Sequence, residues 1–460
     1  MATTTASATT SSLQELAQRH LWLHFSRMGG YGEDHEIPII ARGDGCYVWD
    51  EHGKRYLDAL SALFCVNIGH GRHEVAQAGA DQARELGFFT NWSFAHPPAI
   101  ELAARIASLA PGDLNRVFFT SGGSEAVESA LKLVRQYHKL TGHPNKTKFI
   151  AREIAYHGST LGALTATGVT GLREPFEPFT PGGCHVPNTN LYRLPDGFAA
   201  ADLAESVARA IEFQGPDTVA AVIMEPVQNA GGCFVPPEGY FQRIREICDE
   251  YDVIFISDEV ICSWGRLGEW FGCERYGSQP DIITTAKGIT SAYAPMGAAI
   301  VSDRIAEPFL SGTSSFLHGF TFGGHPISAA VAMANIDVFE QDGILEHVRS
   351  HEPAFHEMLN SLADIPIVGD VRGAGYFAGI ELVKDRATKE SFSAEESETL
   401  LRGFLSGELF RRGLICRADD RGDPVIQLSP PLISNEEHFA EIEGVLRPVL
   451  EEASQKMDLY

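Results

Sequence analysis

The sequence of 460 residues lacks the patterns that define several classes of protein. No apolar run approaches the ~18 residues that a membrane span needs. Lys and Arg number 36 against 61 Asp and Glu, so the formal net charge is −25. This balance opposes binding to nucleic acid or to an anionic membrane. We therefore expect a soluble protein whose ligands are small molecules.

The cysteine pattern and the opening segment exclude further classes. Eight cysteines are scattered without a CxxC pair, which fits neither a disulfide framework nor a zinc site. The opening MATTTASATTSS has no basic residue and no apolar core, so we interpret it as a frayed tail and not as a leader peptide. Reduced thiols and no leader indicate a cytoplasmic protein.

Several catalytic fingerprints are also missing. The sequence has no GxGxxG after a strand, no GxxxxGK[ST], no GxSxG and no HExxH. Its 17 histidines lack the spacing of metal ligands. No metal site is predicted, and a dinucleotide fold has no supporting motif.

What the chain does contain is an alternation of apolar strands and helices. Strand-like segments cover residues 117–120, 218–226, 253–260 and 282–286, with helical periodicity between them. Near-continuous apolar strands separated by helices predict an α/β domain with a mostly parallel sheet that helices cover on both faces.

The two ends of the chain predict a smaller α+β domain. Segments 371–383 and 424–432 alternate polar and apolar residues, and residues 45–60 resemble a hairpin around His52-Gly53. We expect the large domain at 75–330. The small domain is then built from an N-terminal segment, 1–74, and a C-terminal segment, 331–460.

Lys287 ends the β-branched strand 282–286, with Gly288 behind it. A lysine carries a hydrated charge and seldom sits in apolar surroundings without a task. The alternative is a lysine that marks the end of the strand and reaches solvent.

The turn FFTSGGSEA places Gly122-Gly123 between a strand and a helix. Backbone N–H groups of residues 121–124 would converge at the helix N-terminus, where the helix dipole favours an anion. Ser121 and Ser124 add hydroxyl donors. The alternative is an ordinary turn with Ser124 as N-cap and Glu125 and Glu128 in the first turn.

Asp258 and Tyr156 occupy comparable places after apolar stretches. Asp258 ends VIFISD, where a buried carboxylate needs a positive or hydrogen-bond-donating partner. Tyr156 precedes His157 and Gly158 in a tight turn, from which an aromatic ring can stack on a planar ligand. An Asp that caps the next segment and a packed surface tyrosine are the alternatives.

The combination is more specific than its parts. An anion cradle, a buried Asp258 and a strand-end Lys287 occur in this order on one parallel sheet, and such sheets bind ligands at their carboxyl edge. A lysine for a Schiff base, a carboxylate for a pyridinium and an anchor for phosphate are what pyridoxal phosphate requires.

With these motifs the sequence resembles the class III (ω-) aminotransferases, pyridoxal-phosphate enzymes of fold type I, from about Leu21 almost to the C-terminus. The resemblance is carried by SGGSEAVESALKL, YHGSTLGAL, EPVQNAGG, VPPEGY, SDEVICSWGRLGEWFG, PDIITTAKGI, HGFTFGGHP and VRGAGYFAGIEL. LFCVNIGHGRHE and EVICSWGRLGEWFG most resemble the amine:pyruvate and β-alanine:pyruvate branch.

The resemblance implies roles for individual residues. Lys287 matches the Schiff-base lysine, Asp258 the partner of the pyridine nitrogen, Val260 the residue under the ring and Tyr156 the one stacked above it. Lys287, Asp258 and Tyr156 are the implied catalytic residues. The implied cofactor-binding set also includes Ser121, Gly122, Gly123, Ser124, His157, Glu225 and Thr321.

Thr321 in HGFTFGGHP matches a phosphate ligand donated by the neighbouring subunit, so the resemblance implies a homodimer with shared sites, and leaves a tetramer open. A turn threonine is the alternative. Two departures concern specificity. The phosphate turn is TSGGSEA where the family usually has TNSGSEA, and Phe64 stands where amine:pyruvate members commonly have tryptophan.

Arg417 in LICRADD matches a family arginine that pairs with the acceptor's carboxylate. A surface ion pair with Asp419 or Asp420 is the alternative. The implied apolar wall of the substrate pocket comprises Phe25, Phe64, Phe88 and Trp92.

The implied reaction moves an amino group from an ω-amino acid or primary amine to a small keto acid such as pyruvate, with Lys287 as general base and acid and with ping-pong kinetics. An aminomutase or decarboxylase would use the same lysine and aspartate. A nicotinamide oxidoreductase and a non-catalytic binding protein are the competitors outside the class. An absorbance spectrum with an amine added would separate them, but the physiological substrates and the stereoselectivity stay open.

Overall fold

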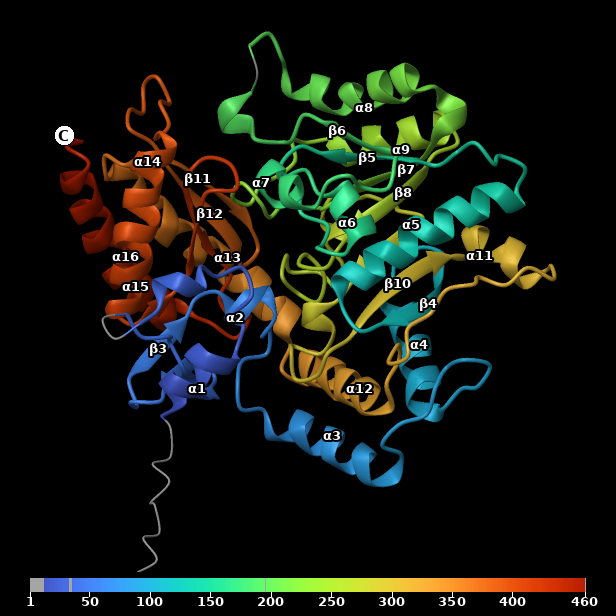
Figure 1. Ribbon diagram of the computed structural model, residues 1–460, viewed down its shortest axis with the longest axis horizontal. Coiled ribbons are helices and arrows are strands. Elements are labelled where there is room, and N and C mark those ends of the chain that lie inside the picture. Colours follow the sequence, from blue (N-terminus) through green and yellow to red (C-terminus); the bar gives the residue numbers. More distant parts are fainter. Residues whose placement is uncertain (1–11, 33–34, 195, 460) are drawn as a thin grey trace, which may run out of the picture.

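The computed structural model of the protein describes residues 12–32, 35–194 and 196–459 (Figure 1). Most of the expected N-terminal tail, residues 1–11, lies outside the described residues. In the described part of the chain, no helix is both long and apolar enough to span a bilayer.

A seven-stranded sheet forms the centre of the larger part of the molecule. Its order is β4-β10-β9-β8-β7-β5-β6. These strands are β4 (Leu114–Thr120), β5 (Lys148–Arg152), β6 (Gly183–Val186), β7 (Val219–Met224), β8 (Ile254–Asp258), β9 (Ile282–Thr285) and β10 (Gly297–Ser302). All neighbours from β9 to β6 pair in parallel, whereas β10 runs antiparallel to both β4 and β9. The predicted mostly parallel sheet is confirmed.

Helices cover both faces of this sheet because its central strands are apolar on both sides. They include α5 (Gly123–Leu140), α8 (Ala200–Gln214) and α9 (Tyr240–Glu250). Alternate residues of β7 pack on opposite faces of the sheet. Ala221 and Ile223 belong to a hydrophobic cluster with residues of α5, whereas Val222 and Met224 belong to another with residues of α8 and α9. Figure 1 shows α8 beyond one face of the sheet and α5 over the other.

The remaining helices lie at the ends and edges of the fold. They are α1 (Leu13–His20), α2 (Ser61–Phe64), α3 (His73–Glu85), α4 (Pro97–Leu109), α6 (Leu161–Ala166), α7 (Thr170–Arg173), α10 (Gly272–Arg275), α11 (Asp303–Leu310), α12 (Pro326–Gln341), α13 (Ile344–Ser361), α14 (Ala394–Ser397), α15 (Ser406–Arg411) and α16 (Glu436–Lys456). Helix α12 packs against α3 and α4 below the sheet in Figure 1.

Two four-stranded sheets form the smaller part of the molecule. One has the order β1-β2-β3-β13 and the other β11-β12-β15-β14. Their strands are β1 (Ile40–Asp44), β2 (Tyr47–Asp50), β3 (Arg55–Asp58), β11 (Val368–Ala374), β12 (Phe377–Leu382), β13 (Leu414–Ile415), β14 (Arg417–Asp419) and β15 (Val425–Leu428). The hairpin predicted around His52-Gly53 is confirmed as β2 and β3.

The two ends of the chain meet in the first of these sheets. Leu57 of β3 pairs in parallel with Leu414 of β13. This pairing supports a small domain built from both ends, and we keep the division at residues 74/75 and 330/331 as a proposal.

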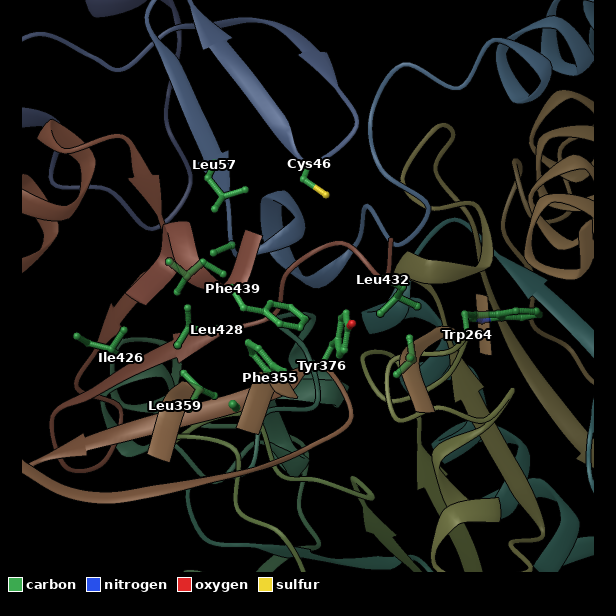
Figure 2. Packing of buried hydrophobic residues seen from close by; sticks show 14 of the residues in the cluster. Cys46, Leu57, Trp264, Phe355, Leu359, Tyr376, Ile426, Leu428, Leu432 and Phe439 are labelled. Atoms are coloured by element: carbon green, nitrogen blue, oxygen red, sulfur yellow. The ribbon is translucent and has the colours of Figure 1, made fainter. Parts of the chain in front are cut away.

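One hydrophobic core runs from the small sheets to the edge of the large one (Figure 2). Phe355, Tyr376 and Phe439 pack against one another in tilted and edge-on pairs with ring centroids 5.2–5.6 Å apart. Leu432 lies between this group and the fully buried Trp264, which precedes the strand that carries Lys287. The continuous core fixes the two parts of the molecule against each other around the site described next.

Candidate active site

A cavity of about 420 Å³ lies at the carboxyl edge of the parallel strands. Five of its wall segments directly follow β4, β5, β7, β8 and β9. Sequence-predicted residues that line it are Ser121, Gly122, Gly123, Ser124, Tyr156, His157, Glu225, Asp258, Val260 and Lys287. Parallel sheets bind ligands at this edge, so the topology gathers residues that are far apart in the sequence.

Asp258 ends β8 and is held from three directions. Its Oδ2 lies 2.6 Å from Nδ1 of His157, and its Oδ1 accepts hydrogen bonds from the Thr284 hydroxyl, at 3.1 Å, and the Val260 N–H, at 3.2 Å. Only 3% of Asp258 is exposed. The predicted need for donating partners is therefore met by the protein, and the Val260 contact is the capping interaction that the alternative interpretation proposed.

Lys287 follows β9 and begins a short 3-10 helix, η5 (Lys287–Ile289). Its φ of 49° lies in the left-handed region, which a side chain with a Cβ seldom adopts. Among the described residues, none forms a hydrogen bond or ion pair with its amine. Burial lowers the pKa of Lys287, with the charge of Arg417 acting in the same direction and Cys65 and Asp258 opposing it. Lys287 lines the cavity, and the solvent-reaching alternative is not what the structure shows.

The Gly122-Gly123 turn lies where it was predicted, between β4 and α5. Gly122 is the N-cap in place of Ser124, and no side chain caps the helix. The Ser121 N–H donates to Glu125 at 2.7 Å, so it is already used. The first N–H groups of α5 have no helical acceptor and face the cavity region, which suits an anion.

Close packing requires glycine at two places in this wall. A Cβ on Gly123 would lie 2.8 Å from Val260, and one on Gly158 would lie 2.5 Å from the Ser124 hydroxyl. That hydroxyl accepts the Ser159 N–H at 3.0 Å, which ties the turn after β5 to the N-terminus of α5.

Glu225 is a second buried carboxyl group in the wall, following β7. Its Oε1 accepts the Asn229 N–H at 3.2 Å, and its Oε2 lies 3.8 Å from the Arg152 guanidinium. Burial raises the pKa of Glu225, against the lowering effect of His157 and Arg152. The wall thus holds two carboxyl groups in different environments.

Arg417 and Phe64 lie next to each other, but neither is among the residues that line the cavity. The Arg417 guanidinium lies 6.0 Å from the centroid of the Phe64 ring, and Phe64 meets Phe377 edge-on at 5.7 Å. Arg417 and Asp419 form an ion pair at 3.4 Å. The alternative pairing with Asp419 therefore occurs, but the pair is largely buried and does not lie on the open surface.

The other aromatic residues predicted for the pocket do not line the cavity of their own chain. Phe25 is 70% exposed and reaches the site only through Arg421. Phe88 contacts Phe322, and Trp92 lines a separate apolar hollow. Phe88 and Trp92 belong to the segment between α3 and α4, none of which lines the cavity.

Thr321 is exposed and lies in the loop before α12, beside the same hollow. The hollow has a volume of about 920 Å³. Its walls include Trp92, Phe118, Phe316, Leu317 and Phe320. Thr321 and its neighbours in this loop are not among the residues that line the cavity of their own chain.

Sequence reasoning missed several residues of the site. The segment 290–296 contributes Thr290, Ala292, Pro295 and Met296 to the cavity wall. Thr284 and Arg421 support Asp258 and Tyr156, respectively. Thr284 could have been found from the sequence, because it occupies the strand that ends in Lys287. Arg421 lies in an irregular turn with no local signal.

A lysine, a buried carboxylate and a helix N-terminus around one cavity at this edge define a pyridoxal-phosphate enzyme of fold type I. The sequence pattern of the family described as Aminotransferase class-III matches residues 30–450. The chain belongs to this family.

Related proteins agree with this assignment over nearly the whole chain. A protein of Mycobacterium tuberculosis named probable aminotransferase is 58% identical over 97% of this chain and 96% of its own length. The putrescine–pyruvate aminotransferase of Pseudomonas aeruginosa is 41% identical over 97% of each chain. The crystal structure of the ω-transaminase of Pseudomonas jessenii in complex with PMP has a TM-score of 0.92 and 34% identity, covering 97% of this chain and 99% of that one.

Class III aminotransferases use pyridoxal phosphate, and the residues present fit this group. The free N–H groups at the start of α5 suit its phosphate. Asp258 suits a protonated ring nitrogen, and the unpartnered Lys287 amine suits a carbonyl. The protein is therefore an aminotransferase that depends on pyridoxal phosphate, and family membership rules out the nicotinamide oxidoreductase.

Proposed function

We propose that the enzyme transfers an amino group from a primary amine or an ω-amino acid to a small keto acid such as pyruvate. The main support is the cavity in which Lys287, Asp258 and the start of α5 converge, together with 41% identity to a putrescine–pyruvate aminotransferase. An aminomutase or decarboxylase would need the same residues, but the related proteins named above are aminotransferases.

Lys287 is the proposed carrier of the proton. Pyridoxal phosphate supplies a conjugated ring that accepts the electrons left on the donor carbon. The lowered pKa of Lys287 favours the neutral amine, which can take a proton from that carbon and return it elsewhere. Proton transfer by one group in both directions explains why a second acid is not required.

Asp258 is the proposed counter-charge for the ring nitrogen. Its carboxylate is oriented by His157 and Thr284 at 2.6 and 3.1 Å, so little reorganisation is needed when charge develops. Val260 and Tyr156 are the proposed contacts of the two ring faces. Glu225 is a further wall residue near the cofactor.

The phosphate site is proposed to need two subunits. Gly122, Gly123 and Ser124 supply groups from one chain, with Ser121 behind them. More than half of Trp92, Leu317 and Phe322 is exposed in a single chain, which supports the proposal that another copy covers the region around Thr321. In such a homodimer, Thr321 would bind the partner's cofactor, and Phe88 and Trp92 would complete the partner's substrate pocket.

Arg417 is the proposed acceptor clamp. Its planar guanidinium suits the carboxylate of a keto acid, and Phe25 and Phe64 offer apolar surface for the rest of the substrate. A carboxylate-free amine would leave Arg417 with Asp419.

The location in the cell is part of the proposal. All eight cysteines are free, and five of them are buried. Free thiols are typical of the reducing cytoplasm, where we place the enzyme.

The two half-reactions test the function separately. Adding a primary amine to the purified holoenzyme should convert the bound cofactor to its amine form and release a carbonyl product, both visible by absorbance and chromatography. Pyruvate should then restore the original spectrum and yield alanine. Release of carbon dioxide in place of a carbonyl product, or a rearranged amine that stays at the same oxidation level, would contradict transamination.

A further inference from the structure

Arg421 lies beside the acceptor clamp and shares its counter-ion. Asp419 is the last residue of β14, between the two arginines in the sequence. Its Oδ2 is 3.4 Å from the Arg417 Nη2, and its Oδ1 is 3.7 Å from the Arg421 Nε. The side chains of Arg417 and Arg421 are only 18% and 17% exposed, and that of Asp419 is 7% exposed. Two guanidinium groups therefore share one buried carboxylate.

Neighbouring carboxylates are engaged elsewhere. Asp420 binds Arg402 through two contacts of 2.7 and 3.0 Å. Asp423 lies 2.9 Å from Arg193. The group formed by Arg417, Asp419 and Arg421 consequently carries a net positive charge, which suits an incoming anion.

Asp419 holds neither arginine tightly. Both contacts exceed the 2.7–2.9 Å typical of charge-assisted hydrogen bonds (about this range in proteins). Its Oδ1 accepts the Asp420 N–H at 3.1 Å, and its Oδ2 is buried without a hydrogen-bond partner among the described residues. Removing Arg417 from this carboxylate therefore breaks no short hydrogen bond.

Two aromatic rings fix Arg421 at the cavity. Its guanidinium lies 5.5 Å from the centroid of the Tyr156 ring and 5.7 Å from that of Phe25. Such cation–π contacts hold the side chain where it is. Tyr156 also lines the cavity, so Arg421 stays next to the site whether or not Arg417 moves.

We propose that Arg421 is a positioning residue for the acceptor half-reaction. By neutralising Asp419, it lets Arg417 exchange this internal carboxylate for the carboxylate of the keto acid. Asp419 then competes with the carboxylate of the keto acid for Arg417. The relative strength of its interactions with Arg417 and Arg421 sets the KM for the acceptor. The inference rests on the proposed role of Arg417 and adds the residues that decide how easily Arg417 is released.

Substitution of Arg421 tests the proposal first. In the Arg421→Gln variant, Arg417 is the only arginine that pairs with Asp419, and Asp419 therefore holds it more strongly. The KM for pyruvate should then rise about fivefold. The readout is the KM for pyruvate relative to the KM for a carboxylate-free amine, because loss of the contact with Tyr156 acts on both half-reactions, whereas release of Arg417 concerns the acceptor alone. Arg421→Lys keeps the charge and should retain a KM near that of the wild type. Arg402→Gln is the matched control, since Arg402 pairs with Asp420 in the same region but lies outside this group.

Substitution of Asp419 supplies the decisive comparison. Asp419→Asn keeps the acceptor for the Asp420 N–H and removes the competing charge, so the KM for pyruvate should fall below that of the wild type. In this background Arg421→Gln should change the KM for pyruvate by less than about twofold. Asp419→Ser serves the same comparison if the Asn variant is unstable in a thermal unfolding test.

Two outcomes would overturn the inference while leaving the function intact. Equal effects of Arg421→Gln in both backgrounds would mean that Arg421 binds the acceptor directly. A raised KM in Asp419→Asn would mean that Asp419 orients Arg417 and does not compete for it. An unchanged KM for pyruvate in Arg417→Ala would instead remove the acceptor clamp itself, and with it the basis of both proposals.

Discussion

His157, in the turn after β5, and Asp258, the last residue of β8, meet with Nδ1 and Oδ2 2.6 Å apart. His157 is 2% exposed and its Nε2 has no hydrogen-bond partner among the described residues. The Thr284 hydroxyl binds the other carboxylate oxygen from the next strand. Three strands of the sheet therefore fix the direction in which Asp258 presents its charge.

We expect kcat to depend on the negative charge of Asp258 more than on the shape of its side chain. Asp258→Asn should lower kcat roughly 100-fold or more, because a neutral amide cannot stabilise a protonated ring nitrogen as electrons reach the ring. Thr284→Val is the matched control: it removes one hydrogen bond and keeps the charge, so its effect should be far smaller. Turnover of cofactor-saturated Asp258→Asn at the wild-type rate would refute the role.

Lys287→Ala should lower turnover roughly 1,000-fold or more, since proton transfer by a positioned amine is lost. Reduction of the holoenzyme with borohydride followed by mass spectrometry should find the cofactor on the Lys287 peptide in the wild type only. Lys389→Ala is a suitable control, because Lys389 also has a left-handed backbone, with φ of 58°, and is not among the residues that line the cavity. A variant of Lys287 that transaminates normally would contradict the central assignment.

Arg417→Ala should raise the KM for pyruvate strongly, on the order of 100-fold, because a bidentate contact to the acceptor's carboxylate is lost. The half-reaction with a carboxylate-free amine should be nearly unaffected. Stopped-flow absorbance resolves the two half-reactions. If both slow equally, or neither does, Arg417 is not the acceptor clamp.

Thr321→Ala should weaken cofactor binding roughly tenfold, because one hydrogen bond to a charged phosphate disappears. The effect requires a dimer, since Thr321 does not line the cavity of its own chain. Equilibrium dialysis measures the affinity, and sedimentation at assay concentration measures the assembly. Thr313→Ala, at another exposed threonine, should change neither. A fully active monomer would disprove the shared site.

Glu259, next to Asp258, predicts a pH dependence of stability. It is fully buried, accepts hydrogen bonds from the N–H groups of Gly272 and Cys273, and burial raises its pKa from 4.5 to about 7. Between these values the folded state binds more protons than the unfolded state, so the contribution of Glu259 to stability falls as pH rises through this window. The loss is about 3 kcal/mol in total.

Urea unfolding of wild type and Glu259→Gln at several pH values measures this contribution as a difference. The advantage of the wild type should shrink from pH 5 to pH 7 and then stay constant (these limits are rough and follow from the two pKa values). A difference that does not change with pH would show that Glu259 has the same pKa in both states.

The large sheet and most of the cavity could be predicted from the sequence because their signals are local. Apolar strands such as β7 and β8 are identified by composition alone, and the site residues lie at strand ends or in the turns that follow them. The antiparallel direction of β10 could not be predicted, since it depends on the order in which strands pair. The sequence also could not show that Trp92 lies apart from the cavity of its own chain, since that placement depends on tertiary packing.

The sequence also could not predict which side chains form hydrogen bonds between different parts of the sheet. A hydrogen bond such as that between His157 and Asp258 joins residues about a hundred positions apart, and no spacing rule connects them. Arg421 was overlooked because an arginine in a turn is usually solvated. The proposed role of Arg421 follows only from its contacts with Asp419 and with the two aromatic rings beside it.

The parallel pairing of β3 with β13 has a consequence for synthesis on the ribosome. Strand β3 leaves the exit tunnel early, but its neighbour at this edge is translated only after most of the chain has been made. Until then, β3 offers unsatisfied backbone groups and the apolar Leu57 to other nascent chains. The cell must therefore protect this edge during elongation, and yield in a heterologous host should respond to chaperones that act on nascent chains.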